Sequence, residues 1–223
     1  MTTHSLAADT PLATIRANIA QSEKIAGRPS GATTLIAISK TKPVEAIEDL
    51  IAQGQRVFGE NRVQEAEAKF PELRARYPDL ELHMVGQLQS NKADDAVALF
   101  DVIHSLDRMS LAKALAAAMT KAGRQVPCFI QVNIGEEEQK GGCALPDLPQ
   151  FLEQVRALGL PVAGLMAVPP ADVEPSPYFA LLAKLARDHG LDQLSMGMSG
   201  DYETAVRIGA THVRIGSALF GSR

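Results

Sequence analysis

The stretch Thr34-Leu-Ile-Ala-Ile-Ser-Lys40-Thr-Lys42-Pro43 decides the interpretation of this chain. An apolar run of strand length ends on Lys40, and the proline after it is suited to open the helix predicted over 44–53. Because side chains alternate along a strand, Ile36, Ile38 and Lys40 share one face. A primary amine therefore stands at the carboxyl end of a strand, where α/β enzymes carry reactive groups. For this strand alone, a lysine that only extends its amine to solvent is the alternative.

Helical and strand patterns alternate along the rest of the chain. Thr10, followed by proline, predicts the start of a first helix that ends near Gly27. Strands separated by helices pair in parallel through right-handed crossovers, so we expect an α/β fold, a single (β/α)8 TIM-type barrel with an extra N-terminal helix. An open doubly wound sheet is the alternative, and no Gly-x-Gly-x-x-Gly turn after the first strand supports it. The eight predicted strands cover 33–40, 56–60, 80–86, 102–106, 127–134, 162–167, 193–198 and 212–216.

Composition limits the classes of protein to which the chain can belong. Its 223 residues, 46% of them hydrophobic, fit one domain over 10–223 after a disordered tip over 1–9. The net charge is −4 with scattered Lys and Arg, which predicts no nucleic-acid and no membrane partner. Cys128 and Cys143 form neither a disulfide framework nor a metal cluster, so a cytoplasmic location is expected. No apolar helix face stands out as an interface, which favours a monomer.

Small residues follow the last two predicted strands. Ser199 and Gly200 come after the seventh strand, and Gly216 and Ser217 come after the eighth. In a closed barrel the loops after these two strands form the usual phosphate site, because their backbone N–H groups are free to bind an anion. The alternative is that the glycines only make tight turns. Two such turns at these two strands favour the phosphate site.

Arg214 links the amine to this phosphate site. It shares a strand face with His212 and Gly216, so it points into the barrel, and barrel closure places it beside Lys40. A cation near an amine favours the neutral, nucleophilic amine that attacks aldehydes. Amine, arginine and phosphate site together predict pyridoxal 5′-phosphate, with Arg214 facing the ring nitrogen. A structural arginine in an internal ion pair is the alternative.

Further polar residues follow other strands. Asn61 is predicted to contact the edge of a cofactor ring or to cap the next helix. His83 is predicted to point inward under the ring, and a buried, hydrogen-bonded histidine is the alternative. Ser90 and Asn91 are predicted to cap the helix that follows them. Lys140 lies in a charged, glycine-rich stretch that is typical of a mobile solvated loop.

Six short motifs follow one another along the chain, over 39–43, 58–61, 83–86, 88–92, 197–199 and 213–217. In combination they resemble the pyridoxal-phosphate homeostasis protein family, which is similar in fold to the barrel domain of alanine racemase. The resemblance implies a fold-type III cofactor site in which Lys40 forms an internal aldimine with pyridoxal 5′-phosphate and Arg214 faces the pyridine nitrogen. It implies that Lys42 and Lys140 match family lysines that influence cofactor exchange. It also implies that the phosphate is held by Ser199, Gly200, Gly216 and Ser217.

The resemblance leaves more than one function open. The first hypothesis is a carrier for intracellular vitamin B6 homeostasis, which holds pyridoxal phosphate without turnover and delivers it to apo-enzymes. The second is a racemase or decarboxylase that uses the same aldimine. Racemases of this fold carry a further β domain, whereas this chain ends seven residues after Gly216, which favours the carrier. A Schiff-base aldolase acting on a sugar phosphate is a third hypothesis.

Overall fold

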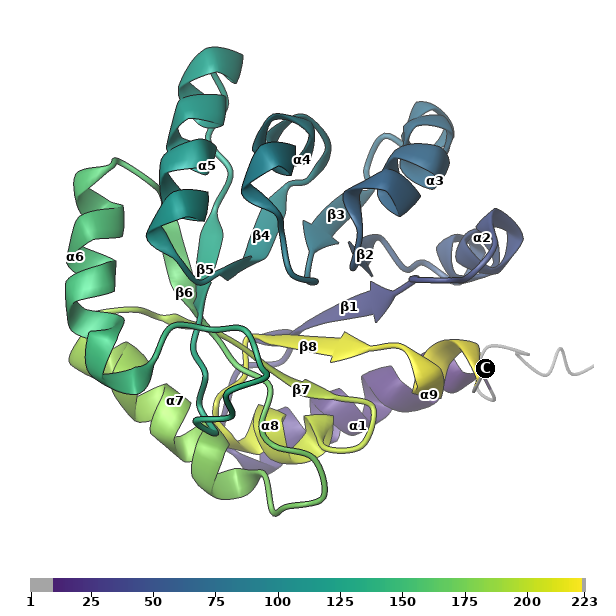
Figure 1. The fold of residues 1–223 in the computed structure, drawn as a ribbon. Coiled ribbons are helices and arrows are strands. Elements are labelled where there is room, and N and C mark those ends of the chain that lie inside the picture. Colours follow the sequence, from purple (N-terminus) through teal and green to yellow (C-terminus); the bar gives the residue numbers. More distant parts are fainter. Residues whose placement is uncertain (1–9, 222–223) are drawn as a thin grey trace, which may run out of the picture.

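The structure is a computed structural model that describes residues 10–221. The predicted disordered tip over 1–9 lies outside the described residues, and the division into that tip and one domain stays a prediction. Within the described residues, eight parallel strands close into a barrel in sequence order, and the first strand pairs with the last (Figure 1). This confirms the predicted (β/α)8 barrel and excludes the open sheet. The strands are β1 (Thr34–Ile38), β2 (Val57–Glu60), β3 (Glu81–Met84), β4 (Val102–Leu106), β5 (Cys128–Gln131), β6 (Val162–Met166), β7 (Gln193–Met198) and β8 (His212–Ile215).

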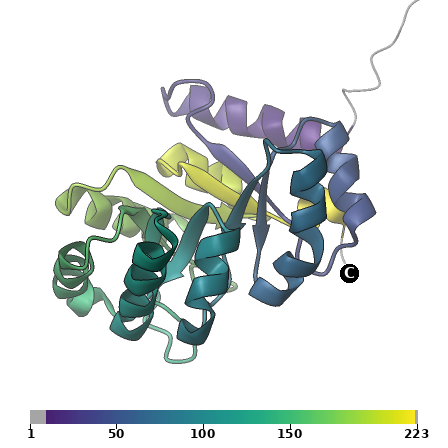
Figure 2. The ribbon, with the colours of Figure 1, turned by 90° about the horizontal axis from the view of Figure 1, so that it is seen from above.

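Helices surround the barrel, as the view from above shows (Figure 2). Two short 3-10 turns, Ser90–Lys92 and Leu145–Asp147, precede the fourth and sixth helices. The helices cover the outward faces of the strands, so parallel strands are buried on both sides. They are α1 (Pro11–Ile25), α2 (Val44–Ala52), α3 (Val63–Arg76), α4 (Ala93–Leu99), α5 (Met109–Ala122), α6 (Leu148–Ala157), α7 (Ser176–Asp188), α8 (Tyr202–Ile208) and α9 (Ser217–Phe220).

The extra N-terminal helix α1 belongs to the outer ring. Thr10 caps it by accepting a hydrogen bond from the backbone N–H of Ala13 at 3.2 Å, and a proline occupies its first turn, as predicted. It lies beside α8, where Asn18 donates to the Tyr202 hydroxyl at 2.9 Å (Figure 1). The helix α9 after the last strand has only one turn, which is too short to cover the outward side of the barrel. α1 covers this side in its place.

Element ends are the main differences from prediction. The strands over 102–106 and 193–198 match their predicted bounds. β1 stops at Ile38 because the chain turns at Thr41, whose φ is +62°. Ser90 and Asn91 do not cap α4, because they lie in the 3-10 turn themselves and make no side-chain cap bond. The single turn α9 was not predicted.

The register where the barrel closes corrects one expectation about the site. Arg214 pairs with Ile36 on β1, not with Lys40, because the two strands are staggered as a barrel requires. The predicted faces are confirmed: Val213 and Ile215 pack in the apolar layer under the helices, and Arg214 lies inside the barrel. Lys40 lies two residues beyond β1, and it shares with Arg214 the lining of the cavity at the barrel mouth.

No helix among residues 10–221 combines the length and apolar character needed to cross a bilayer.

Candidate cofactor site

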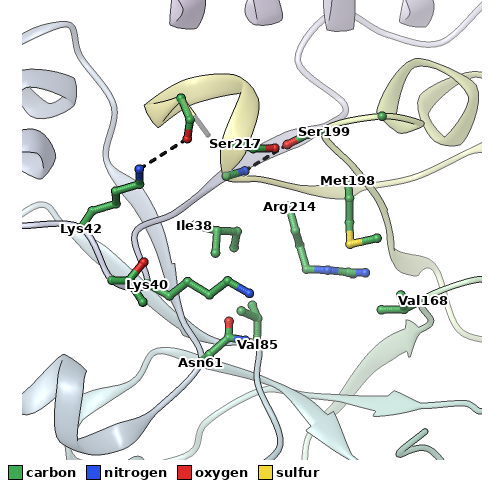
Figure 3. A pocket seen from close by; sticks show the side chains of 14 residues that line it. Ile38, Lys40, Lys42, Asn61, Val85, Val168, Met198, Ser199, Arg214 and Ser217 are labelled. Carbon is green, nitrogen blue, oxygen red and sulfur yellow. Dashed lines mark hydrogen bonds between the residues drawn. The ribbon is translucent and has the colours of Figure 1, made fainter. Parts of the chain in front are cut away.

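A cavity of about 520 Å³ opens at the carboxyl ends of the barrel strands (Figure 3). The amine of Lys40, from the loop after β1, and the guanidinium of Arg214, from β8, both point into it. Apolar side chains form part of its wall, which gives a flat organic ring a surface to pack on. The lining residues are Ile38, Lys40, Thr41, Lys42, Asn61, Val85, Val168, Met198, Ser199, Gly200, Arg214, Gly216, Ser217 and Gly221.

The turn that carries Lys40 is held from behind by Lys69 on α3. Its ammonium donates to the carbonyl of Ser39 at 3.0 Å and to that of Lys42 at 3.3 Å, so it spans the two residues between them. It also pairs with Glu60 at 2.8 Å and Glu65 at 2.7 Å. One buried ammonium group thus holds both ends of the turn, so the backbone that carries the Lys40 side chain is fixed.

Lys69, Glu60 and Glu65 form a clamp behind the turn that carries Lys40, and Glu60 is its buried carboxyl group. Its side chain has no exposed surface, and it accepts a hydrogen bond from the Ser39 hydroxyl at 2.7 Å. Burial raises the pKa of the Glu60 carboxyl, and the hydrogen bonds from Lys69 and Ser39 oppose that rise. Glu65, beside it, accepts from the backbone N–H of Thr41. The left-handed conformation of Thr41 is therefore supported by a carboxylate.

Arg214 is tied down at both terminal nitrogens. Nη1 donates to Ser195 Oγ at 2.6 Å and Nη2 donates to the Ala167 carbonyl at 2.9 Å. Burial lowers the pKa of the guanidinium to about 10, while the Asp201 carboxylate acts in the opposite direction. No carboxylate is paired directly with it among the described residues, so the alternative of an internal ion pair is not what the structure shows.

Donors for an anion meet between the loops after β7 and β8. The backbone N–H groups of Gly216 and Ala218 both donate to Ser199 Oγ at 3.3 Å, so they converge on one oxygen atom. The N–H of Gly200 has no hydrogen-bond partner among residues 10–221. Ser217 adds a hydroxyl to the same side of the cavity (Figure 3). Backbone and hydroxyl donors of this kind suit a phosphate.

Asn61 reaches the cavity from the end of β2. It makes no capping bond to α3, whose N-cap residue is Arg62, so the capping alternative is not observed. Gly86 allows this placement, because a Cβ at that position would lie 2.3 Å from the carbonyl oxygen of Asn61. The loops after β2 and β3 can therefore approach each other only through a glycine.

His83 lies deeper than expected. It is fully buried inside the barrel, hydrogen-bonded to His104 at 2.9 Å and to Glu81 at 2.7 Å, and it is not among the cavity's lining residues. The placement under a ring is thus corrected in favour of the buried, hydrogen-bonded alternative. The reason is its position in β3, where the third of four residues points to the barrel interior below the mouth.

The two other lysines occupy different surroundings. Lys42 lines the cavity but turns toward α9, where it donates to the carbonyls of Phe220 at 3.3 Å and Gly221 at 3.4 Å (Figure 3). Lys140 lies outside the lining. It pairs with Glu137 at 2.6 Å and donates to the Pro169 carbonyl at 3.1 Å, which joins the loops after β5 and β6.

The charge of the cavity is one-sided. Its lining contains Lys40, Lys42 and Arg214 and, within the described residues, no acidic side chain. Burial raises the pKa of the Cys128 and Cys143 thiols to about 12, so neither is a nucleophile near neutral pH. Among residues 10–221 no group of His, Cys, Asp and Glu side chains could hold a metal ion. The cavity suits an anionic organic ligand.

Sequence reasoning missed the residues that support the site. The pair Glu65 and Lys69 follows the i, i+4 spacing of a helix face, and Glu60 ends β2, which was the available signal for the clamp. Ser195 and His104 occupy inward positions of their strands, but nothing in the sequence says which inward residues meet across a barrel.

Comparison with known proteins agrees with this geometry. The family model for the alanine racemase N-terminal domain matches residues 11–223. The pyridoxal phosphate homeostasis protein of Pseudomonas aeruginosa is 42% identical over 218 residues, which cover 95% of this chain and 94% of that protein. The chain belongs to the pyridoxal phosphate homeostasis protein family.

Solved structures extend the comparison to three dimensions. PipY of Synechococcus elongatus is 40% identical with a TM-score of 0.81, over 91% of this chain and 100% of that one. PipY has also been solved with PLP bound. Alanine racemase from Streptomyces coelicolor, at 21% identity, has a TM-score of 0.68 over 95% of this chain and 59% of its own. That similarity concerns the fold alone, so the family membership rests on the homeostasis proteins.

Proposed function

We propose that this protein binds pyridoxal 5′-phosphate in the cavity at the barrel mouth. The observation that carries the proposal is that Lys40 and Arg214 point into one cavity whose lining is cationic and which ends on the Ser199 and Gly216 donors. An aldehyde that carries a phosphate needs an amine and an anion site within one cavity. PipY, which has been solved with PLP bound, supports the same ligand.

Lys40 is the proposed point of covalent attachment. Its Nζ adds to the aldehyde carbon, a water molecule leaves, and a C=N bond joins lysine and cofactor. Arg214 donates toward the ring nitrogen. Gly200, Gly216 and the hydroxyls of Ser199 and Ser217 bind the phosphate, and Asn61 contacts the ring edge.

Borohydride reduction tests the attachment. The protein loaded with pyridoxal phosphate is expected to absorb visible light and to lose this absorbance on reduction, with the label on Lys40 in peptide maps. The matched control is Lys42→Ala, which removes the other lining lysine and leaves the label in place. A label that falls mainly on Lys42 or Lys140, or persists in Lys40→Ala, contradicts the assignment.

We further propose a homeostatic role, in which the cofactor is held reversibly and delivered to apo-enzymes without amino-acid turnover. The names of the homeostasis relatives support it. Among the described lining residues, the side-chain amines are those of Lys40 and Lys42, and both come from the loop after β1. A racemase needs acid/base groups on two faces of its substrate.

Transfer to an apo-enzyme tests this role. Protein carrying pyridoxal phosphate should restore the activity of an apo-aminotransferase, whereas Lys40→Ala treated in the same way should not. The racemase or decarboxylase alternative predicts turnover of an amino acid at about 1 per second or more, within the ordinary enzyme range. Turnover at that rate would overturn the carrier role and leave cofactor binding intact.

A further inference from the structure

A row of hydrogen-bonded side chains runs through the barrel interior from the cavity to the opposite end of the barrel. It starts with Arg214 Nη1 and Ser195 Oγ, 2.6 Å apart, and continues from Ser195 Oγ to His104 Nδ1 at 2.8 Å. His104 Nε2 lies 2.9 Å from His83 Nδ1, and His83 Nε2 lies 2.7 Å from Glu81 Oε1. The row thus joins the cavity to the amino end of β3.

The two ends of the row determine the direction of every hydrogen bond in it. Arginine can only donate, and an ionised carboxylate can only accept. If both histidines are neutral, His83 donates from Nε2 to Glu81 and must accept at Nδ1 from His104 Nε2–H. His104 then accepts at Nδ1 from the Ser195 hydroxyl, whose oxygen accepts from Arg214. Each donor has one acceptor, and both histidines carry their proton on Nε2.

A charged His83 would break this order. It would donate to both neighbours, and His104 would then have to donate from Nδ1 to Ser195 Oγ. The serine oxygen would receive two donors, and its own proton would have no acceptor among the described residues. An unmatched buried hydroxyl is costly, so the neutral arrangement is favoured.

The residues around the row exclude water from its buried part and hold the histidine rings in place. His83, His104 and Ser195 have no exposed surface, whereas the Glu81 side chain is 47% exposed. His104 stacks on the Phe129 ring with centroids 4.4 Å apart. Burial lowers the pKa of His104 well below its usual range, and the nearby His83, His212 and Arg214 act in the same direction.

We propose that Ser195, His104, His83 and Glu81 are positioning residues for Arg214, which fix the orientation of its guanidinium in the cavity. Ser195 holds Nη1, and the directional row behind it holds the Ser195 oxygen with its lone pairs toward the arginine. Since Nη2 is held by the Ala167 carbonyl, the guanidinium plane cannot turn. The effect on the bound cofactor rests on the proposed function, but the row itself does not.

Nuclear magnetic resonance of ¹⁵N-labelled imidazoles tests the row in the protein without cofactor. Near neutral pH, His83 and His104 are expected to be neutral and protonated on Nε2. Glu81→Gln keeps an oxygen that accepts from His83 and should preserve both tautomers, whereas Glu81→Leu should disturb them. A charged His83, or a His104 protonated on Nδ1, in the unsubstituted protein overturns the proposed direction.

A matched pair of serine variants tests the effect on the cavity. Ser195→Ala removes the hydroxyl that holds Arg214. Ser105→Ala removes an equally buried hydroxyl that has no hydrogen-bond partner among the described residues. Ser195→Ala should weaken binding of pyridoxal phosphate about tenfold and shift the absorbance of the bound cofactor, because a charge-assisted bond to the arginine is lost. Ser105→Ala should change neither.

The outcomes separate this inference from the proposed function. If the unsubstituted protein does not bind pyridoxal phosphate, the proposed function fails, and the imidazole spectra still decide the row. If it binds the cofactor and the two serine variants behave alike, Arg214 does not depend on the row, and the positioning role is wrong. Should Ser195→Ala fail to fold, Glu81→Leu gives the same test from the exposed end of the row.

Discussion

Lys69 lies behind the turn that carries Lys40, and its ammonium is the shared partner of Glu60, Glu65 and two backbone carbonyls. Its side chain is only 8% exposed, so these bonds form in a medium that screens charge weakly. A buried carboxylate whose cation is removed is left uncompensated, and this costs far more than a pair at the surface.

Lys69→Met is therefore expected to lower the free energy of unfolding by about 3–5 kcal/mol. Urea unfolding measures the loss. Lys184→Met is the matched control, because Lys184 also pairs with a carboxylate one helical turn away, but on an exposed surface. It should leave the unfolding curve unchanged. Equal effects of the two variants would mean that the clamp does not stabilise the turn.

A substitution at Gly216 can test phosphate binding without disturbing the fold. A Cβ placed there would lie 3.5 Å from the Ile38 Cβ, an ordinary contact, so Gly216→Ala should leave stability nearly unchanged. A phosphate that approaches the Gly216 backbone would meet that methyl group, and we expect weaker binding of pyridoxal phosphate but not of pyridoxal. Calorimetric titration with both ligands measures the difference, and equal losses for the two would refute a phosphate contact at Gly216.

At the level of elements, the sequence determines which face of each strand is inward, and alternation correctly predicted Arg214 inside and Val213 outside. It does not determine the stagger between strands. This is why Arg214 was placed beside Lys40 but pairs with Ile36. The same limit applies to His83, because its depth below the mouth depends on where its strand begins in the barrel.

The contacts that hold Lys40 and Arg214 in place could not be predicted from the sequence, for a related reason. The clamp of Lys69 joins side chains from β2, α3 and the loop after β1, and the row behind Arg214 joins side chains from four strands. Their contacts arise only when the barrel closes, whereas the motifs near Lys40 and Ser199 lie within single loops. Local patterns therefore predicted the lining of the cavity better than the layer that holds it.

The loops after β5 and β6 are joined by one lysine. Lys140 pairs with Glu137 in its own loop and donates to the Pro169 carbonyl in the next. Lys140→Met removes both bonds, so backbone amides over 136–143 and 169–175 should exchange faster with deuterium. Lys113→Met, an exposed change on α5, serves as the control. Unchanged exchange in both loops would show that the lysine does not hold them together.

The whole molecule is predicted to be a monomer. Among residues 10–221, four large hydrophobic side chains are exposed, and they belong to different segments of the fold. They are Ile25, Leu158, Val173 and Met198. A stable dimer buries a contiguous, well-packed surface. Light scattering at micromolar concentration should give a mass near 23.8 kDa, and twice that mass at all concentrations would contradict the prediction.

The stability of the whole barrel should depend on pH through its interior histidines. Burial lowers the pKa of His212 to about 4, and it lowers the pKa of His104 as well. Between that value and the ordinary pKa of about 6.5, the unfolded chain binds protons that the folded barrel does not. The stability contributed by these neutral rings is therefore complete above about pH 6.5 and is lost as the pH falls toward about 4. Glu60 acts in the opposite direction, because its raised pKa lets the folded state keep a proton longer as the pH rises.

Urea unfolding at about pH 7 and about pH 5 measures the balance, and His212 alone should account for a loss of about 2 kcal/mol at the lower pH. His212→Asn isolates its share, since asparagine offers a polar group near Thr211, the hydrogen-bond partner of His212, but does not titrate. The variant should be less stable than the unsubstituted protein near neutral pH, because it packs less well, and should lose less stability on acidification. If both proteins lose the same stability between the two pH values, His212 does not titrate in this window, and the acid sensitivity of the barrel has another source.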